Sequence, residues 1–543
     1  MKGFYIKTYD AIIIGSGLGG LTCGATLAKA GKKILILEQH SLIGGCATCF
    51  KRKGMKIDAG LHELDWGNPK TDMKHLIFKK LGLDKKIQLI KLPNTWTIRT
   101  QTKNLSIPHG IENVKSTLKN LFPKEHKGID LYFKKIKFQA FLVRKFPWDM
   151  SFIDFFFAPI TTLIFFLKNM IFNHSVGKIM DSCIKDNQLK QILNINISYY
   201  HHDPYKFIWS FHAIPQKHYY DQGVYIKGGS QSLSDALSEI IKENGGEVKA
   251  NCEVTSILTK NQIAIGVKYL DKKTQENLSI KASKIIANCD PAIVYDSLLD
   301  KNIDTISDTK NTKKFPITTS LVCAYMVFDK NISELYPEMS YNTFVTDDKI
   351  LNSSFKDIKI ADIPIQNRSI AFINYSKIDS GLSQRDDRYL AVAALYSNFE
   401  EWEGLDQTQY KDKKTKLLGQ IQNRLEKVFM GINTHCIHAE LSTPKTIQNY
   451  IKTRKGTPYG YDQNQEGFIG REKFYSKNIK NLFFASSFGF PGGGFTGAIL
   501  GGYRTANKIL DPYMYPKKIA LAAIIGVIAA EIIKYILKSF PPS

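Results

Sequence analysis

The stretch that decides the fold runs from Tyr9 to Gly20 and reads YDAIIIGSGLGG. Its apolar, β-branched first half predicts a buried strand, and the glycine turn behind it predicts a helix opening at Leu21. A second strand, Lys33 to Leu37, ends at Glu38, roughly 20 residues after the glycines, where an acid reaches a ribose hydroxyl. The order of strand, turn, helix, strand and acid predicts a dinucleotide site with its pyrophosphate on a helix N-terminus.

The residues expected to hold the dinucleotide lie in this turn and at the end of the second strand. Glycines allow the tight turn, the close approach of the backbone to the ligand and the packing of helix on strand. Glycine turns are common in unrelated loops, so the prediction depends on the ordered elements around this one. The predicted binding residues here are Gly15, Ser16, Gly17, Leu18, Gly19, Gly20, Glu38 and Gln39.

Length and composition bound the class of protein. The chain has 543 residues, of which 43% are hydrophobic and 23% charged, so it is expected to fold into two or more packed domains. Its formal charge of +24 favours anionic partners such as phospholipid headgroups, although scattered surface lysines give the same balance. Because no zinc-finger spacing or RNA-binding signature accompanies the charge, nucleic acid is not an expected partner, and no metal site is predicted.

The first residues and the cysteines indicate the compartment. The opening segment MKGFYIKTYD holds no apolar stretch, so no secretory signal is predicted. The eight cysteines show no dense repeated spacing, which fits a reducing compartment better than a disulfide framework. The body of the protein is therefore expected on the cytoplasmic side.

Two apolar segments indicate contact with lipid. Residues 519–537 read IALAAIIGVIAAEIIKYIL, and the helix predicted over 516–538 is long enough to anchor in a membrane, although Glu531 and Lys534 also suit an interfacial or docked helix. Phe152 to Phe172 is rich in phenylalanine but carries internal charges and Pro159, so it predicts either a monotopic apolar surface and substrate entrance or an ordinary core helix. Membrane lipid is thus an expected partner, and the cytoplasmic face of a membrane is the expected location.

Changes in pattern along the chain predict a discontinuous organisation. A strand, a glycine turn and a helix recur near residue 490, where they can close a second edge of the ligand, and an aromatic helical stretch and a strand-rich stretch interrupt the fold. The predicted blocks are residues 1–105, 221–300 and 466–512 for the dinucleotide domain, 106–220 for a helical apolar cap, 301–465 for a substrate-domain sheet and 516–538 for the terminal helix.

Six motifs stand in an order that resembles a known superfamily. They are GSGLGG with Glu38, GGCATCF with DAGLH, GGSQSLSDAL with GGEV, the NCDP turn at Asn288, GTPYG at Gly456 and FPGGGFTGAILGG at Phe490. From about Tyr9 to Leu510 the chain resembles the FAD-dependent amine oxidases and carotenoid desaturases, and among them the branch of retinol saturases and carotenoid isomerases. The resemblance implies an α/β fold with a discontinuous, glutathione reductase-like Rossmann-type FAD-binding domain, an α+β substrate domain, the apolar cap and the hydrophobic C-terminal helix.

The resemblance also implies FAD as the cofactor and extends its site. In such proteins the first glycine turn and Glu38 hold the ADP half, Gly44 and Gly45 pass the flavin side, and Val254 offers its backbone to the adenine. The last glycine segment is implied beside the pyrophosphate, ribitol and isoalloxazine through Gly493, Gly494, Phe495, Thr496 and Gly497. Ser486 and Ser487 replace the Gly-Asp or Gly-Ala that related flavoproteins often carry, so their contact with FAD is the weakest part of the carry-over.

His62 and Glu63 are the candidate catalytic residues. A histidine after DAGLH follows the retinol saturase branch, whereas phytoene desaturases usually place proline there, so a saturase-like direction is preferred. His62 can assist proton transfer if it titrates near neutrality. The alternative is that His62 and Glu63 are not catalytic and form hydrogen bonds with the neighbouring backbone. Cys46 and Cys49 form a Cys-x-x-Cys motif that raises a second alternative, thiol-disulfide chemistry.

The predicted function follows from the flavin and from the apolar surroundings. We expect a membrane-associated FAD-dependent oxidoreductase that saturates, desaturates or isomerises a carbon-carbon double bond in a carotenoid, retinoid or related isoprenoid lipid. The alternatives are an amine or other small-molecule oxidase on the same fold and a non-catalytic FAD-binding membrane protein. NAD(P)H, a quinone or oxygen can serve as the electron partner, and the sequence leaves the oligomeric state open.

Overall fold

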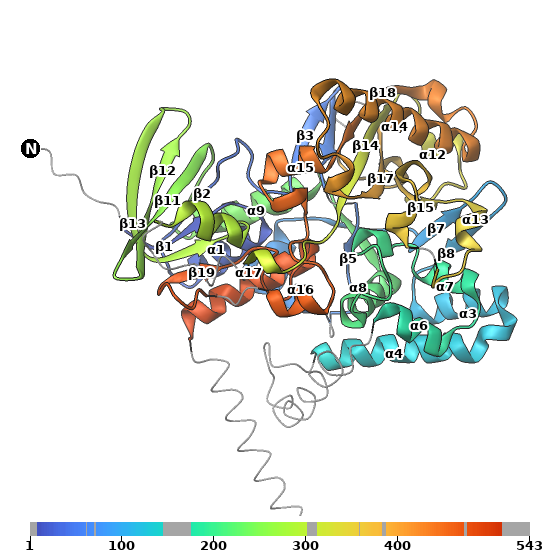
Figure 1. Ribbon diagram of the computed structural model, residues 1–543, viewed down its shortest axis with the longest axis horizontal. Helices are drawn as coiled ribbons and strands as arrows, with labels where there is room; N and C mark the ends of the chain where they lie inside the picture. Colours follow the sequence, from blue (N-terminus) through green and yellow to red (C-terminus); the bar gives the residue numbers. More distant parts are fainter. Residues whose placement is uncertain are drawn as a thin grey trace, which may run out of the picture.

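The computed structural model describes residues 8–60, 62–69, 72–144, 175–300, 312–357, 359–382, 387–471 and 475–512 (Figure 1). Two predicted segments, Phe152 to Phe172 and the helix over 516–538, lie outside these residues. Within the described ranges, no helix combines the length and the apolar character that crossing a membrane requires.

A mostly parallel sheet forms the predicted Rossmann-type domain. Its centre is β1, whose Ile13 pairs with Ile36 on one side and with Ile286 on the other. The strands come from three distant stretches of the chain, which confirms the predicted α/β fold with a discontinuous Rossmann-type domain. In order across the sheet they are β10 (Glu247–Lys249), β2 (Ile34–Leu37), β1 (Tyr9–Ile14) and β13 (Glu276–Ala287), which pairs with β19 (Leu482–Phe484) and with the antiparallel β12 (Ile263–Asp271) and β11 (Cys252–Lys260).

Three helices pack with this sheet into one apolar core. They are α1 (Leu18–Lys29), α9 (Ser230–Glu243) and α17 (Gly494–Leu510). Helix α1 begins at Leu18 rather than at the predicted Leu21, because the glycine turn runs directly into the helix. Its Leu21 and Leu27 are fully buried, and each such side chain contributes about 1.5–3 kcal/mol of transfer free energy. The glycine turn is therefore held between a rigid strand and a rigid helix.

A second sheet forms the substrate domain, with α14 (Gln407–Val428) packed into its core. Two of its strands, β7 and β8, come from the block 93–107, which overlaps the range 1–105 predicted for the cofactor domain. The physical reason is burial, since Trp96 of β7 packs edge-on against Phe344 of β15. The strand order is β18 (Cys436–Ser442), β14 (Ser320–Phe328), β17 (Tyr389–Ser397), β16 (Ile370–Asn374), β15 (Asn342–Val345), β7 (Trp96–Arg99) and β8 (Asn104–Ile107).

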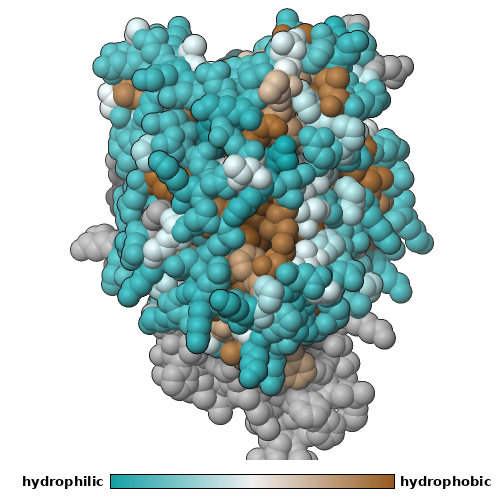
Figure 2. All heavy atoms as spheres, turned by 90° about the vertical axis from the view of Figure 1, so that its right-hand side faces the viewer, coloured by the Kyte–Doolittle hydropathy of each residue, from teal (hydrophilic) through white to brown (hydrophobic). Residues whose placement is uncertain are grey.

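Helices from the predicted cap range 106–220 cover the edge of the substrate sheet (Figure 1). They share a core that includes Tyr132, Phe133 and Trp209. Seen from the side that carries α7 and α13, the surface is largely hydrophilic, with an apolar strip down its middle (Figure 2). The helices are α3 (Ile111–Leu121), α4 (His126–Arg144), α6 (Val176–Cys183), α7 (Asn187–Leu193) and α8 (Trp209–Asp221), with the 3-10 turn η4 (Ile197–Tyr199).

Short elements join the two sheets around the cavity described below. A small sheet of β5 (Leu64–Asp65), β9 (Gly223–Ile226) and β6 (Leu89–Lys91) lies at this junction. The remaining short elements are β3 (Cys49–Arg52), β4 (Met55–Asp58), α2 (Met73–Leu81), α10 (Pro291–Ile293), α12 (Ile332–Leu335), α13 (Asp348–Leu351), α15 (Pro444–Ile451) and α16 (Gln465–Gly470).

Candidate active site

The glycine turn at the start of α1 leaves no room for side chains. A Cβ on Gly19 would lie 1.8 Å from the carbonyl oxygen of Ala485, and one on Gly20 would lie 2.5 Å from the carbonyl oxygen of Gly15. Gly15 itself has a φ of 92°, which glycine adopts without strain. Because Gly17 caps the helix without a side-chain hydrogen bond, backbone N–H groups of the first turn face a ligand position.

Glu38 lies at the end of β2, where the sequence places it, and is almost completely buried. Its Oε2 accepts hydrogen bonds from the backbone N–H (2.8 Å) and the hydroxyl (2.7 Å) of Ser16, and its Oε1 accepts one from the N–H of His40 (2.8 Å). A carboxylate has about four acceptor positions, so one remains for a ribose hydroxyl. Gln39 follows directly, and the hydrogen bond from Cys252 N to Glu38 O (2.7 Å) brings the start of β11, with Val254, beside this end of the sheet.

Gly44 and Gly45 approach the first glycine turn, and their place beside the flavin stays a prediction. Gly44 forms an isolated β-bridge with Gly17, and its N–H donates to the Ser16 hydroxyl at 3.1 Å. A Cβ on Gly44 would lie 2.2 Å from the carbonyl oxygen of Ala47. The Ser16 hydroxyl thus ties the two glycine segments together and to Glu38.

The start of α17 forms a second glycine cradle. Gly492, Gly493 and Gly494 all have positive φ angles (80°, 54° and 67°), and Gly493 caps the helix without a side-chain hydrogen bond. Within the described residues the buried hydroxyl of Ser486 has no hydrogen-bond partner, whereas the Ser487 carbonyl accepts from Arg471 (3.2 Å). Two glycine cradles, two helix starts without side-chain caps and an unsatisfied hydroxyl fit a bound FAD.

A cavity of about 260 Å³ opens onto the start of α17. One wall carries His62, Glu63 and Asp65, and another carries Gly493 to Gly497. Elsewhere the lining is mainly aromatic and aliphatic, with Tyr199, Tyr200, Phe211, Ile214, Tyr459 and Leu500 among its side chains. The structure therefore brings the two predicted catalytic residues and the last glycine segment to one apolar cavity.

Burial acts on the two catalytic candidates in opposite directions. It lowers the pKa of His62 to about 4, and the ring Nδ1 lies 2.9 Å from the Tyr375 hydroxyl. The predicted condition that His62 titrates near neutrality is therefore not met, because a buried imidazolium is not stabilised at this position. Burial raises the pKa of Glu63 to about 8, a hydrogen bond from Asn342 partly opposes this, and nearby Asp65 adds to it. Glu63 is thus a neutral carboxylic acid at neutral pH.

Polar atoms around Glu63 remain without partners. Asn342 Nδ2 donates to Glu63 Oε2 at 3.3 Å, but Glu63 Oε1, Asn342 Oδ1 and the Tyr199 hydroxyl have no hydrogen-bond partner within the part of the chain that the structure describes. Unsatisfied buried polar atoms cost free energy, and they gather where a water or a ligand completes them. The carboxylic acid of Glu63 consequently has an oxygen available to the cavity.

The sequence analysis missed a buried charge cluster on the same wall. Asp65 Oδ2 lies 3.1 Å from Lys74 Nζ and 3.0 Å from His218 Nδ1, and Asp72 Oδ2 lies 2.9 Å from Lys74 Nζ. Asp65 Oδ1 also accepts a hydrogen bond of 2.5 Å from the Thr496 hydroxyl at the start of α17. His218 and Thr496 are far in the sequence from Asp65, Asp72 and Lys74, and the five residues share no motif, so no local sequence pattern predicts the cluster.

The cysteine pair beside the first glycine segments is not poised for thiol-disulfide chemistry. Cys46 and Cys49 are both free thiols. Burial raises the pKa of Cys46 to about 11 and holds that of Cys49 well above its ordinary value. Because the thiolate is the reactive form, the structure disfavours this alternative.

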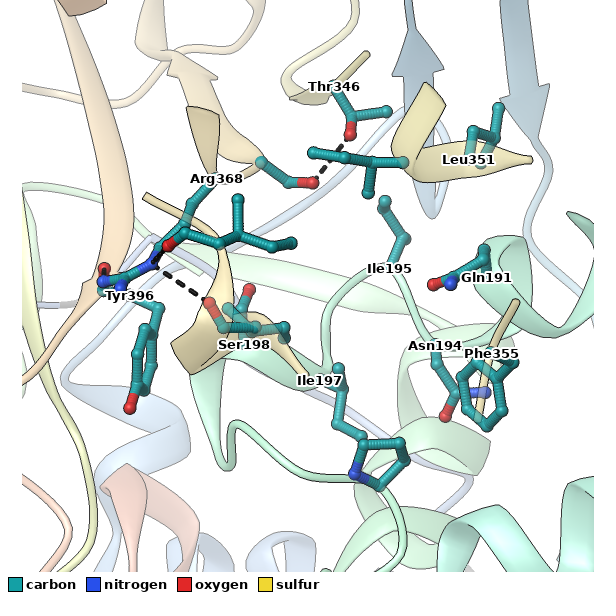
Figure 3. Close-up of a pocket in the computed structure, with 15 residues that line it drawn as sticks. Gln191, Asn194, Ile195, Ile197, Ser198, Thr346, Leu351, Phe355, Arg368 and Tyr396 are labelled. Atoms are coloured by element: carbon teal, nitrogen blue, oxygen red, sulfur yellow. Dashed lines mark hydrogen bonds between the residues drawn. The ribbon is translucent and has the colours of Figure 1, made fainter. Parts of the chain in front are cut away.

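A second cavity, of about 50 Å³, lies between η4 and α13 (Figure 3). Arg368 faces it, but its guanidinium is fully engaged by the carbonyl oxygens of Ile360, Ile363 and Tyr396 and by Glu401 at 2.6 Å. The space is enough for only one or two waters, and the arginine is bound to the protein itself. This cavity is structural in character.

Comparisons with known proteins agree with this geometry. A family model described as "Flavin containing amine oxidoreductase" matches residues 18–510. The all-trans-retinol 13,14-reductase of Danio rerio is 25% identical over 94% of this chain and 88% of its own length, and the chloroplastic prolycopene isomerase of Daucus carota is 25% identical over 93% and 80%. An oxidoreductase from Methanosarcina mazei shares the fold with a TM-score of 0.60 at 15% identity, covering 92% of this chain and 100% of that one.

Proposed function

Because the chain belongs to the family of flavin-containing amine oxidoreductases, we propose that it acts on a carbon-carbon double bond of an apolar isoprenoid, with a retinoid or carotenoid as the substrate class. The observation that carries this proposal is a neutral carboxylic acid, Glu63, on the wall of an apolar cavity that also holds the start of α17. In the proposed reaction this acid acts together with bound FAD.

The residues that would hold FAD are those of the two glycine cradles. Ser16 and Glu38 suit the ADP half, and Gly44, Ser486 and the first turn of α17 suit the flavin half. When bound, FAD supplies or accepts a hydride at the substrate carbon. NAD(P)H, a quinone or oxygen remains the proposed electron partner.

Glu63 holds the proton that the reaction needs. Saturation of a double bond adds a hydride to one carbon and a proton to its neighbour, and isomerisation of a polyene can begin with protonation of one carbon. A carboxylic acid with a pKa of about 8 carries that proton at neutral pH and lies close to the value at which general acids work best. His62, which is neutral and paired with Tyr375, orients this wall instead of donating a proton.

The cavity lining suits a hydrocarbon chain. Each CH₂ group that enters it contributes about 0.8 kcal/mol to binding through the loss of contact with water. The rings of Tyr200 and Tyr459, 6.3 Å apart at 50°, favour a second candidate, an amine oxidase, because aromatic faces attract a cation. Against this candidate, Glu63 is neutral, and the carboxylate of Asp65 is already engaged by Lys74, His218 and Thr496.

We further propose that the protein works at the cytoplasmic face of a membrane and draws its substrate from the lipid. The exposed side of α4 carries Leu131, Phe138 and Phe141, which are 39–45% exposed, and Lys134 lies on the same face. Ala140, between the two phenylalanines, lines the 260 Å³ cavity. Apolar side chains beside lysines are typical of surfaces that contact anionic lipid.

A purified sample tests the proposal directly. The protein is expected to show a flavin absorption spectrum, and after reduction with dithionite it should convert all-trans-retinol or prolycopene to a product seen by mass spectrometry and chromatography. A gain of two hydrogen atoms indicates saturation, and an unchanged mass with a new retention time indicates isomerisation. Oxidation of putrescine with peroxide release would favour the amine oxidase, and bound flavin with no turnover of any of these probes would overturn the proposed activity.

A further inference from the structure

The buried charge cluster links four elements at the cavity wall. Asp65 belongs to β5, Asp72 and Lys74 to the start of α2, His218 to α8 and Thr496 to the first turn of α17. All four charged or titratable side chains are at most 8% exposed, and Lys74 is completely buried. Buried ions of this kind are costly to desolvate, so each charge depends on its partners.

The carboxylate of Asp65 is charged within this cluster. Burial by itself would raise the pKa of Asp65, yet the Lys74 ammonium and His218 hold it below its ordinary value, so the carboxylate is ionised. Lys74 likewise stays protonated, because Asp65 and Asp72 outweigh the effect of its burial. Two carboxylates therefore share the Lys74 ammonium, and the Nδ1 atom of His218 lies 3.0 Å from Asp65 Oδ2.

The carboxylate of Asp65 lies at the start of α17. Asp65 uses Oδ2 for Lys74 and His218 and Oδ1 for the Thr496 hydroxyl, so the carboxylate is fixed from both sides. Thr496 lies in the first turn of the helix that closes the flavin half of the cofactor site. In a dry, low-dielectric site, a fixed charge acts strongly on groups beside it.

We propose that Asp65 is a positioning residue that holds a negative charge beside the flavin and lowers its reduction potential, so that electrons pass from the flavin to the substrate. The inference rests on the proposed function, because it takes FAD as the cofactor. Reduction adds electrons to the flavin ring, and a nearby carboxylate opposes that addition. Asp65 thereby favours saturation of a double bond over its formation.

The test is the midpoint potential of the bound flavin, measured by equilibration with a reference dye during anaerobic reduction. Asp65→Asn keeps the shape of the side chain and removes its charge. The expected result is an equilibrium constant for flavin reduction at least tenfold larger, which for two electrons is a potential about 30 mV more positive. Asp65→Glu, which keeps the charge, should remain close to the unmodified protein.

Asp72→Asn makes the same change of charge from the other carboxylate, which does not contact Thr496. This variant should shift the flavin potential in the same direction by a smaller amount. It provides the test if Asp65→Asn fails to fold or to hold FAD. A flavin potential that neither variant changes would overturn the inference. If the unmodified protein binds no flavin, the proposed function itself fails, and the two failures are thus distinguishable.

Discussion

Glu63 and His62 are neighbours in the chain and line the same cavity, but burial makes one a proton donor and the other a neutral ring. A carboxyl group loses its charge when water is removed, and so does an imidazole, because in both cases the charged form is the one that water stabilises. The carboxyl group becomes an acid with a proton to give. The imidazole becomes a base too weak to hold one.

Replacing Glu63 by glutamine should lower kcat by about 10²- to 10⁴-fold while FAD remains bound, because the amide keeps the shape of the side chain and has no transferable proton. Steady-state rates with the identified substrate, together with the flavin spectrum, check this. Glu63→Asp is the matched control, since it restores an acid on a shorter stem and should recover part of the rate. An unchanged kcat in Glu63→Gln would show that the proton comes from elsewhere.

The rate should also depend on pH through Glu63. The reaction needs the protonated acid, so kcat is expected to be level below the pKa and to fall as the pH rises through about 8. A profile of kcat against pH measures this limb. The limb should disappear in Glu63→Gln, and a limb that persists unchanged there would assign it to a different group.

The same pKa predicts a change in stability. The folded protein raises the pKa of Glu63 from its ordinary 4.5 to about 8, so its contribution to stability is complete below pH 4.5 and is lost as the pH rises through 8. Glu63→Gln removes this loss of stability. Near pH 7 its free energy of unfolding should exceed that of the unmodified protein by at most about 3 kcal/mol. Urea denaturation at pH 5 and pH 8 checks the trend, and an equal difference at both would contradict it.

At the scale of elements, the cofactor site depends on the contact between α1 and α17. The two helices meet at glycines, since a Cβ on Gly502 would lie 2.1 Å from the carbonyl oxygen of Gly19, and one on Gly19 would lie 1.8 Å from that of Ala485. This close approach packs the start of α1 against the middle of α17. The strands β1, β13 and β19 hold the helices at that spacing.

Gly19→Ala should therefore cost about 1–3 kcal/mol of stability or more and release FAD, because backbone atoms cannot yield to the new methyl group. Thermal unfolding and the flavin content of the purified protein measure the two effects. Gly419→Ala in α14 is the control: a Cβ there meets no atom within 4 Å, and alanine is the better helix former by about 1 kcal/mol. Full flavin content in Gly19→Ala would contradict the packing argument.

At the scale of the whole molecule, the apolar face of α4 and the cavity belong together. Phe138 and Phe141 lie on the exposed face of α4, and Ala140, between them in the chain, lies on another face of the helix and lines the cavity, so α4 borders both the proposed lipid contact and the cavity. The formal charge of +24 adds a long-range attraction to anionic headgroups.

The double variant Phe138→Gln, Phe141→Gln should bind anionic vesicles about tenfold more weakly, because it removes two aromatic contacts with the acyl boundary. Co-sedimentation with phosphatidylserine-containing vesicles measures this, and rising salt should weaken binding further. Met430→Gln, which replaces an exposed apolar residue of the substrate domain, is the control and should leave binding unchanged. Equal binding by the double variant and the unmodified protein would show that the lipid contact lies on another surface.

Features that depend on neighbours along the chain could be predicted from the amino-acid sequence. The strand, glycine turn and helix from Tyr9, the acid at Glu38 and the glycines before α17 are local patterns, because backbone conformation and close approach restrict which residues fit. The resemblance extended them to FAD. The place of β7 and β8 in the second sheet was not predicted, since nothing near Trp96 in the chain indicates that its partner is Phe344.

Which side chains share the cavity, and how they are charged, follows from the three-dimensional arrangement of the chain. It brought Asp65, Lys74, His218 and Thr496 into one cluster and left Glu63 neutral and His62 unprotonated. The physical reason is that burial and electrostatic interaction depend on distance in space and on the exclusion of water, and neither is set by the spacing of residues along the chain.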